Sequence, residues 1–467
     1  MKKQTKVLLA AALFTLGASF SSMAALKNGT WQLNEEGWQY ANKEGDYESE
    51  VWAMSYGTEY WVNEDAVLGS SEWVEEDGHT YYVQSDGSKT KNAWKYLYAI
   101  DDEDEMEEEN WYYFDSKGRM VTGKETISGS TYYFNSKGQM LTGWVDTTDL
   151  DAEDVTAATI GNVVYTNEDG QLVKSSWINM FPWTMTEDDA YEDDYEYFYA
   201  TSNGKLAKTK TKIDGLHYFF NAETGIMMTG WIEKIDGVYT NTNAINAGDE
   251  AYWTDEVGYA KKDQWLELER AEEDDKEFWF WFDKNGKVFA PAATDANAET
   301  VDFVDGESND LDFTDIEGGV KSKKFGDTYY YFNQKGEMID GLVTINSEIN
   351  YLVDGARQTG KFVLEDNDLD TYEFCFASKT EDDYKKFKAV NGNYDGYLYR
   401  NGQLMTAVDT YDIIDGFIVD VNGAIQHSKT KEYTLDNGAK FKAKDAGYEF
   451  SKVDGSQKYS LKEVVAE

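Results

Sequence analysis

Short aromatic segments recur along this chain at one common spacing, and that spacing limits the possible folds more than any other feature. A segment that ends in Gly-Trp occurs twice, 87 residues apart, at Trp144 and Trp231. A second type begins with an aromatic residue and recurs in steps of 86 and 82 residues, at Trp111, Tyr197 and Trp279. A third type ends in tryptophan and recurs in steps of 83 and 88 residues, at Trp94, Trp177 and Trp265. A fixed internal period is the signature of a repeat architecture, so the sequence predicts a super-repeat of about 85 residues that contains three similar units.

Each unit has the pattern of a β-hairpin. In residues 111–123, WYYFDSKGRMVTG, four aromatic residues precede the turn Asp115-Ser-Lys-Gly118, and a short second strand is expected at Arg119–Val121. Aromatic residues fall on both faces of such a strand, because successive side chains alternate. An isolated hairpin is only marginally stable in water, so neighbouring units must cover both faces. We therefore expect an all-β solenoid of stacked β-hairpin repeats, with almost no helix.

The composition excludes several classes of partner. The formal net charge is −46, which argues against nucleic acid, since binding to a phosphate backbone needs clustered lysine and arginine. Aromatic residues make up 15% of the chain, whereas disordered acidic chains are poor in aromatics. Residues 1–24 carry three lysines, an apolar run and small residues at the end, which is typical of a secretory signal peptide. The apolar run is too short for a membrane span, and we expect a secreted protein associated with the cell wall or cell surface.

The repeat pattern also predicts domain boundaries. Hairpin repeats are expected over 25–290, followed by an acidic insertion at 291–325, degenerate repeats at 326–430 and a lysine-rich C-terminal cap at 431–467. Three acidic blocks, at 101–109, 187–194 and 272–277, fall at one place in the super-repeat. They are interpreted either as solvated loops or as a surface for Ca²⁺ or a basic partner, although no EF-hand spacing is present.

The repeat unit resembles the cell-wall-binding repeats of Gram-positive bacteria. The shared pattern is a Gly-Trp pair, an aromatic strand, a glycine-containing turn and a Met-x-Thr-Gly-Trp ending, and it covers most of residues 26–430. That group includes choline-binding modules, glucan-binding modules of glucosyltransferases and the repetitive domains of large clostridial toxins. The segment GLVTINSEINYLVDG (341–355) especially resembles a short repeat unit of the toxin type. The resemblance implies a superhelix of hairpins that binds choline or carbohydrate in aromatic clefts between units.

The resemblance also implies which residues would line the clefts. The predicted ligand-binding residues, taken over from the matching positions, are Trp111, Tyr133 and Trp144 in one cleft, Tyr197, Phe219 and Trp231 in the next, and Trp279 in the third. Leu342 replaces the Gly-Trp tryptophan of the third cleft, which argues against a full set of choline sites. The glycines of Gly143-Trp144 and Gly230-Trp231 are expected to leave room beside the indole rings. Core packing between hairpins is the alternative role for each of these aromatics.

Enzymatic features are weak in this sequence. His79, His217 and His427 are the three histidines, and they lie in or beside expected strands; Cys375, the single cysteine, has a strand-like context. No nucleophile elbow, zinc-binding helix motif or phosphate-binding loop occurs, and no catalytic residue, metal or cofactor is predicted. The sequence favours a non-catalytic protein that binds a cell-wall polymer or glycan. The alternatives are a structural or adhesive acidic rod without ligand clefts, and a choline-binding surface protein.

Overall fold

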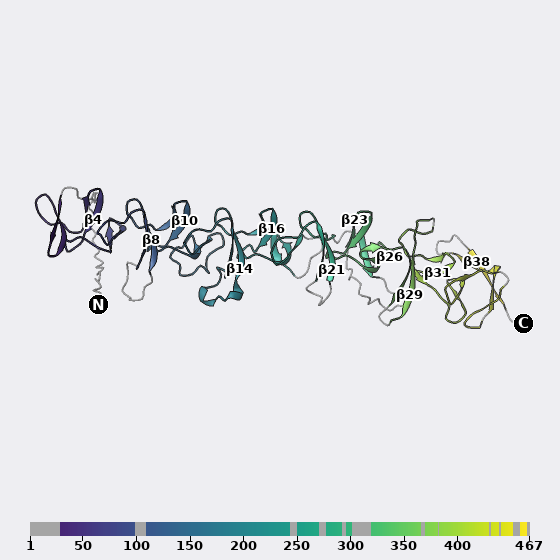
Figure 1. Cartoon of the computed structure of the whole chain (residues 1–467). Helices are drawn as coiled ribbons and strands as arrows, with labels where there is room; N and C mark the ends of the chain where they lie inside the picture. The colour runs from purple at the N-terminus through teal and green to yellow at the C-terminus, as the bar shows by residue number, and fades with distance from the viewer. Residues whose placement is uncertain are drawn as a thin grey trace. The chain divides into compact units, whose positions relative to one another are not determined.

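The computed structural model describes residues 29–98, 109–242, 250–269, 277–291, 296–300, 319–365, 369–381, 383–428, 431–438, 440–451 and 458–464. The predicted signal peptide at 1–24 lies outside these residues. Within the described ranges there is no α-helix; the only helical turns there are the short 3-10 turns η1 (Glu187–Asp189) and η2 (Glu192–Asp194). No helix in this part of the chain has the length and apolar character needed to cross a membrane. The prediction of an all-β chain is therefore confirmed (Figure 1).

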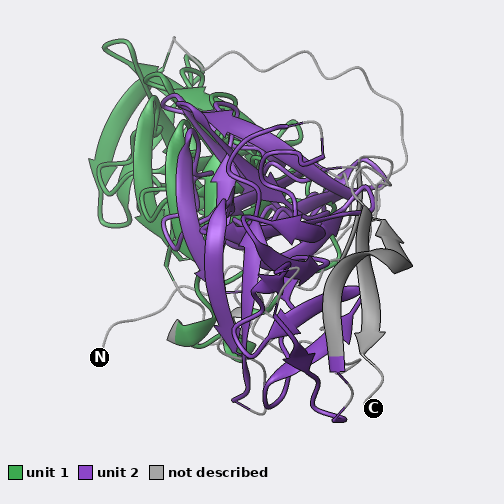
Figure 2. Ribbon diagram, turned by 90° about the vertical axis from the view of Figure 1, so that its right-hand side faces the viewer, with its two compact units in different colours: residues 1–207 green, residues 208–467 purple. Residues whose placement is uncertain are grey.

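The chain divides into two compact units, residues 1–207 and 208–467 (Figure 2). Unit 1 consists of consecutive two-stranded antiparallel hairpins, each formed by strands that are neighbours in sequence. Its strands are β1 (Thr30–Asn34), β2 (Gly37–Ala41), β3 (Val51–Ser55), β4 (Thr58–Val62), β5 (Glu72–Glu76), β6 (His79–Val83), β7 (Ala93–Leu97), β8 (Asn110–Phe114), β9 (Gly123–Ile127), β10 (Ser130–Phe134), β11 (Gly143–Asp146), β12 (Val163–Thr166), β13 (Ser176–Met180) and β14 (Glu196–Ala200).

Unit 2 begins with the same kind of hairpins and then forms larger sheets. Its sheets are β15–β16, β18–β17–β19, β20–β21, a closed sheet β22–β23–β24–β27–β26–β25, the five-stranded β28–β29–β32–β31–β30, β33–β34–β35 and β36–β37–β38. Its strands are β15 (Thr209–Ile213), β16 (Leu216–Phe220), β17 (Gly230–Ile235), β18 (Val238–Asn241), β19 (Ala251–Thr254), β20 (Gln264–Glu269), β21 (Glu277–Phe282), β22 (Ala296–Thr300), β23 (Gly319–Phe325), β24 (Thr328–Phe332), β25 (Gly341–Ile345), β26 (Glu348–Val353), β27 (Ala356–Arg357), β28 (Gly360–Glu365), β29 (Thr371–Phe376), β30 (Gly392–Tyr394), β31 (Tyr397–Arg400), β32 (Gln403–Leu404), β33 (Tyr411–Ile414), β34 (Phe417–Asp420), β35 (Ile425–Gln426), β36 (Tyr433–Thr434), β37 (Lys440–Ser451) and β38 (Lys458–Val464).

The hairpins pair differently from the sequence prediction. β8 pairs with β7, which precedes it, and not with the expected strand at Arg119–Val121. After β8, the carboxylate of Asp115 accepts hydrogen bonds from the backbone N–H groups of Lys117 (2.8 Å) and Arg119 (2.9 Å), which closes the turn. Only a single bridge, Phe114 to Met120, follows this turn. The glycine-containing turn thus joins one hairpin to the next. The strand predicted at 119–121 is reduced to this one bridge, because Met120 donates its N–H to Thr80 of the preceding hairpin and not to β8.

Tight turns close many of the hairpins that have short loops. The two central residues of these turns have positive φ, as in Asp77-Gly78 (51° and 71°) and Asp214-Gly215 (49° and 87°). An Asp-Gly pair suits a type I′ turn, whose twist matches that of the flanking strands. The register of the short hairpins is therefore determined by a local sequence signal.

Backbone hydrogen bonds connect successive hairpins in a solenoid-like stack within each unit. After several of the connecting turns, the first residue donates its N–H to a carbonyl on a strand of the preceding hairpin. In unit 1 these bonds include Met120 to Thr80 (2.7 Å), Met140 to Trp111 (2.9 Å) and Leu172 to Thr131 (2.8 Å). In unit 2 they include Ala260 to His217 (2.8 Å) and Met338 to Trp279 (2.9 Å). Each repeat thus contacts its chain neighbours, as expected for stacked repeats.

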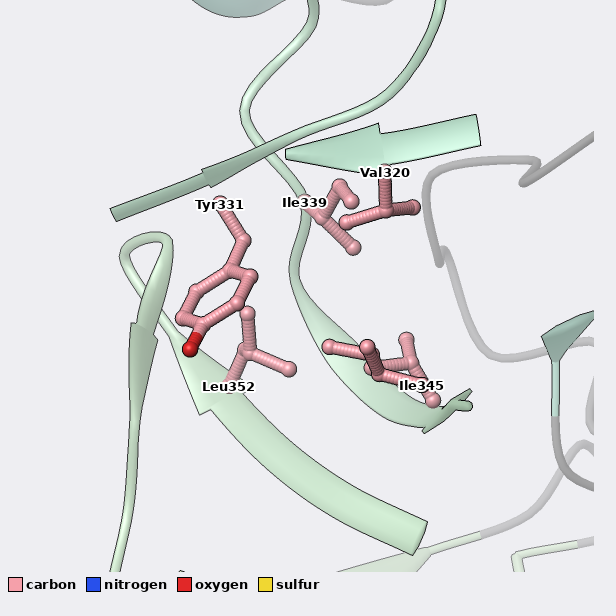
Figure 3. Close-up of a cluster of buried hydrophobic side chains, with 6 residues drawn as sticks. Val320, Tyr331, Ile339, Ile345 and Leu352 are labelled. Atoms are coloured by element: carbon pink, nitrogen blue, oxygen red, sulfur yellow. The ribbon is translucent and has the colours of Figure 1, made fainter. Parts of the chain in front are cut away.

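The hydrophobic core is divided into small clusters between neighbouring hairpins. In unit 1, Ile127, Tyr132 and Phe134 of β9 and β10 pack against Trp94 and Tyr113 of β7 and β8. In unit 2, the closed sheet encloses a more aliphatic cluster, which consists of Val320, Tyr331, Ile339, Val343, Ile345 and Leu352 (Figure 3). Aromatic contacts therefore hold the more faithful repeats together, whereas aliphatic side chains dominate the cluster inside the closed sheet.

Part of the predicted acidic insertion at 291–325 belongs to the closed sheet. β23 pairs with β24 from Lys321 opposite Phe332 to Phe325 opposite Thr328. β22 pairs with both β23 and β25. The sequence boundary at 325 therefore cuts a hairpin, because Phe325 closes the turn to β24. The proposed cap at 431–467 stays a prediction; its strands β36, β37 and β38 form one antiparallel sheet.

Candidate functional site

Three of the predicted ligand-binding residues occupy one equivalent, exposed position. Trp111 lies on β8, Tyr197 on β14 and Trp279 on β21, each on the second strand of its hairpin. Their side chains are 45%, 49% and 40% exposed. The following residue in each strand points to the opposite face and is buried: Tyr112, Phe198 and Phe280. We call Trp111, Tyr197 and Trp279 the exposed aromatic positions.

The surroundings of the exposed aromatic positions differ. Trp111 faces Tyr96 across the hairpin, with 5.2 Å between the ring centroids, and Trp94 lies at 6.4 Å. Tyr96 is 50% exposed, so the two rings form an open platform. Tyr197 lies opposite Asn179, and Trp279 lies opposite Glu267. The first position therefore offers the largest aromatic surface, whereas the other two combine one ring with a polar neighbour.

Three other predicted residues are buried in the core. Tyr133 is 4% exposed and packs with Val145, Val164 and Leu172. Phe219 has no exposed surface, and its ring lies 4.8 Å from that of Tyr252.

Trp231 is 8% exposed and lies 4.8 Å from the ring of Phe280. For Tyr133, Phe219 and Trp231, the structure thus gives the packing role that the sequence left as the alternative.

Trp144, the seventh predicted residue, is half-buried and fixed by its neighbours. Its ring packs edge-on against Tyr165 (4.9 Å) and Phe198 (5.0 Å). Its indole Nε1 donates to the carbonyl oxygen of Phe181 at 2.9 Å. Its contacts are thus with its own cross-strand partner, Tyr165, and with the following hairpin. The structure does not bring Trp111, Tyr133 and Trp144 together as the walls of one open cleft, because Tyr133 is buried.

An open pocket of about 440 Å³ borders β17 and β19 in unit 2. It is lined by Thr229, Gly230, Trp253, Thr254, Asp255, Glu256 and Val257. A Cβ atom at Gly230 would meet nothing within 4 Å, as would one at Gly143. The glycine of the Gly-Trp pair therefore does leave room, but the indole that lines the space is Trp253, the cross-strand partner of Trp231.

Polar groups of this pocket are held in place by local contacts. The carboxylate of Asp255 forms an ion pair with Lys261 and accepts a hydrogen bond from the N–H of Val257 (3.1 Å). Lys261 lies 3.9 Å from the ring centroid of Tyr259. Glu256 is exposed at the rim. An indole face with a fixed carboxylate beside it is suited to a sugar ring, because the ring can stack while its hydroxyls donate hydrogen bonds.

The sequence prediction did not include Trp253, which begins the segment that ends at Trp265 (WTDEVGYAKKDQW, 253–265). The signal was nonetheless present: Tyr165 and Trp253 occupy matching positions, 88 residues apart, before a polar glycine-containing turn. Each lies opposite the tryptophan of a Gly-Trp pair, Trp144 or Trp231. The matching positions of Tyr165 and Trp253 can be interpreted only when their cross-strand partners, Trp144 and Trp231, are known.

The remaining chemically interesting residues are engaged in structural contacts. The backbone carbonyl of His217 accepts the N–H of Ala260 at 2.8 Å, and burial lowers the pKa of its imidazole. Cys375 is buried in β29, and burial raises the pKa of its thiol to about 11. The acidic block at 187–194 lies between β13 and β14, whereas 101–108 and 272–276 lie outside the described residues. Within the described ranges, no group of three or more histidine, cysteine or acidic side chains has a geometry that would hold a metal ion.

Family models match parts of the repeat region. A model of the choline-binding repeat matches residues 121–152, and a model described as a putative cell wall binding repeat matches residues 71–89, 107–120 and 323–338. Glucosyltransferase-I of Streptococcus downei is 24% identical over 310 residues, which cover 61% of this chain and 16% of the relative. This chain thus matches only a small part of that enzyme.

Solved structures with similar repeats come from Streptococcus pneumoniae. The choline-binding domain of CbpL is 22% identical, with 50% of this chain and 97% of that chain covered and a TM-score of 0.33. CbpJ is 16% identical, with 80% and 99% covered and a TM-score of 0.32. The modular autolysin LytC is 17% identical, with 72% and 54% covered and a TM-score of 0.31.

Proposed function

We propose that this chain, which carries repeats of the cell-wall-binding family, is a secreted, non-catalytic protein that binds a cell-wall polymer or glycan at the bacterial surface. The observation that carries this proposal is the recurrence of an exposed aromatic ring at one strand position, in Trp111, Tyr197 and Trp279. An exposed ring at a single site is ordinary for a protein surface. Recurrence at equivalent positions of the super-repeat supports a ligand that is itself repetitive, such as a polysaccharide.

The chemistry of these positions favours a sugar. A pyranose ring presents an apolar face of C–H groups that packs on an aromatic ring, while its hydroxyls bind polar neighbours such as Asn179 and Glu267. The pocket at Trp253 offers the same combination, with Asp255 and Glu256 beside the indole. No step of this proposal needs a catalytic group, and the match to a glucosyltransferase covers 16% of that enzyme.

Two alternatives are distinguished by observations in the same region. Burial of Tyr133, Phe219 and Trp231 favours an acidic surface protein whose repeats have a structural or adhesive role without ligand clefts. The choline-binding alternative rests on the matched choline-binding repeat at 121–152. Both predict that removal of the exposed rings leaves glycan binding unchanged.

The test is retention of the secreted form on insoluble glucan, on purified cell walls and on choline resin. We expect the triple variant Trp111→Ala, Tyr197→Ala, Trp279→Ala to lose retention on glucan or walls by at least about tenfold, because one aromatic contact contributes roughly 1 kcal/mol. Tyr191→Ala, which removes a 74%-exposed ring elsewhere, is the matched control and should bind like wild type. A separate variant, Trp253→Ala, tests the pocket.

Salt separates the ligand classes. The chain carries a net charge of −46, so a phosphate-rich wall polymer would be repelled at long range. Raising the ionic strength from about 0.1 M to 1 M shortens the Debye length from roughly 10 Å to 3 Å. Retention on an anionic polymer should therefore rise with salt, whereas retention on neutral glucan should barely change. Unchanged retention of the triple variant on all three matrices would refute a binding role for the exposed aromatic positions.

A further inference from the structure

A buried lysine occupies a position that is apolar in the neighbouring repeats. The first residue after each connecting turn in this part of unit 1 bridges back to the preceding strand, and at four such positions it is apolar: Leu68, Met120, Met140 and Leu172. The corresponding residue after β6 is Lys89, which bridges to Val83. Its N–H donates to the carbonyl of Glu59 on the preceding hairpin at 2.9 Å, as the others do to theirs. The lysine therefore replaces a core residue of the repeat.

The ammonium group of Lys89 lies in an aromatic cage. Its Nζ is 3.8 Å from the ring centroid of Trp52 and 4.5 Å from that of Tyr81. Trp61 packs against Trp52 with 5.0 Å between the ring centroids, which completes the aromatic cluster of these two hairpins. Trp52 and Tyr81 are 3% and 9% exposed. A desolvated cation over two aromatic faces is the arrangement by which proteins bind ammonium ligands.

Charge and packing both fix the lysine in this cage. The carboxylate of Glu59 lies 3.5 Å from Nζ, and the Lys89 side chain is only 6% exposed. The aliphatic stem packs against the next connecting turn at Gly118, where an added Cβ would lie 2.8 Å from Cδ of Lys89. Burial lowers the pKa of the Lys89 ammonium, while Glu59 and Glu76 act in the opposite direction. The chain thus keeps an ammonium group at a place where the repeat pattern requires none.

A second lysine, on β15 of unit 2, also lies over aromatic rings, although it is only half-buried. Nζ of Lys210 lies 3.9 Å from the ring centroid of Tyr252 and 5.7 Å from that of Phe219. Phe219 is one of the residues predicted to line a ligand cleft. Two buried aromatic clusters, one in each unit, are thus each covered by a lysine of the chain itself.

We propose that Trp52 and Tyr81 form an ammonium-binding site whose ligand is the chain's own Lys89, so that this pair of hairpins is closed to external cationic ligands. The inference does not depend on glycan binding, since its residues lie apart in sequence from the exposed aromatic positions. It assigns Lys89 as a specificity-determining residue: the side chain occupies the space that an alkylammonium or quaternary ammonium group would need. Removal of the side chain converts the closed cage into an open site for a small ammonium ion.

The experiment truncates the lysine and supplies the missing part as a free ligand. Lys89→Ala deletes three methylenes and the ammonium group, which together correspond to n-propylammonium. We expect propylammonium to bind this variant saturably in the millimolar range and to shift the indole N–H signal of Trp52 in NMR spectra, assigned through Trp52→Phe. The neutral isostere 1-propanol should bind at least tenfold more weakly, and the wild-type signal should not respond to propylammonium.

Two outcomes would overturn the proposal. Equal binding of propanol and propylammonium to Lys89→Ala would mean that the space is an apolar cavity and not a cation site. An equal response of the wild-type protein to propylammonium would mean that Lys89 does not close the cage.

If Lys89→Ala fails to fold, a double-mutant cycle of Lys89→Met with Trp52→Leu decides the question. The proposal requires the two substitutions to be coupled by at least fivefold in the unfolding equilibrium constant, and additive effects would contradict it.

Discussion

Substitution of Gly138 by alanine tests the packing of the connecting turns on one another. Gly138 lies in the turn after β10, and a Cβ atom there would lie inside van der Waals contact of the sulfur of Met120, which follows the preceding turn. The same relation joins Gly170 to Met140. A methionine from one turn thus packs against the glycine of the next, and this contact accompanies the backbone hydrogen bonds between hairpins.

Two effects contribute to the expected loss of stability. Gly138 has a φ of +80°, a conformation that costs an alanine roughly 1–2 kcal/mol. The added methyl also overpacks the turn, which costs about 1–3 kcal/mol, and the flexible methionine places this effect near the lower end. We therefore expect Gly138→Ala to lower the local unfolding free energy by about 2–4 kcal/mol.

Gly129→Ala separates these two effects. Gly129 also has a positive φ, +91°, but a Cβ there would meet nothing within 4 Å. It should therefore lose only the backbone part, roughly 1–2 kcal/mol.

Native-state hydrogen exchange is the appropriate assay, because it measures the opening free energy of each segment in a chain whose repeats need not unfold together. The amide of Met140, which is bonded to the carbonyl of Trp111, reports on the stacking of these hairpins. The cost of Gly138→Ala should fall when Met120 is also replaced by alanine, which makes room for the methyl group. Equal losses for Gly138→Ala and Gly129→Ala, with no relief from Met120→Ala, would refute the packing argument.

Other expected outcomes concern acid stability, thiol reactivity and modular folding. The hydroxyls of Tyr252 (2.6 Å) and Tyr239 (2.9 Å) donate hydrogen bonds to the carboxylate of Glu250, and these bonds lower the pKa of Glu250 from 4.5. The ionised carboxylate therefore stabilises the fold fully above pH 4.5, and this stabilisation is lost as the pH falls below that value. The difference in melting temperature between wild type and Glu250→Gln should therefore shrink on acidification; a constant difference down to about pH 3 would contradict this. Cys375, with a pKa of about 11 in place of 9.0, should react with a thiol reagent at about pH 8 roughly 100-fold more slowly in the folded than in the unfolded chain, and equal rates would show that it is accessible. Residues 29–207 and 208–467, expressed separately, should each give the β-sheet circular dichroism of the full chain; loss of structure in either would indicate that the units depend on each other.

The repeat period and the all-β class could be predicted from the sequence because both are local signals. The step between Trp111 and Tyr197 and the alternation of aromatic residues are visible without any contact information. The hairpin partners could not be predicted so well. The aromatic strand at 111–114 is compatible with a partner on either side. After the turn that Asp115 closes, Met120 bonds to Thr80 of the preceding hairpin, a contact between units that the local pattern does not contain. The predicted boundary at 325 falls inside a hairpin for a similar reason, since β23 pairs with β24, which follows the boundary.

The candidate site shows the same limit at the level of single residues. Trp111 and Tyr133 both lie in aromatic strands, and nothing in the composition of these strands separates an exposed ring from a core ring. The separation follows from the stacking: a residue faces solvent when its side of the hairpin is not covered by the next hairpin, as at Trp111, and is buried when it is covered, as at Tyr133. The position of Lys89 follows this rule as well. It is covered by Trp52 on one side and by the turn at Gly118 on the other, and the matching position after β8 holds a methionine, Met120. A buried charge at such a position is costly unless it is paired, and the two aromatic faces together with Glu59 provide the pairing. The selectivity of this chain for neutral or cationic ligands thus depends on which aromatic faces the stacking leaves open and which ones the chain fills with its own lysines.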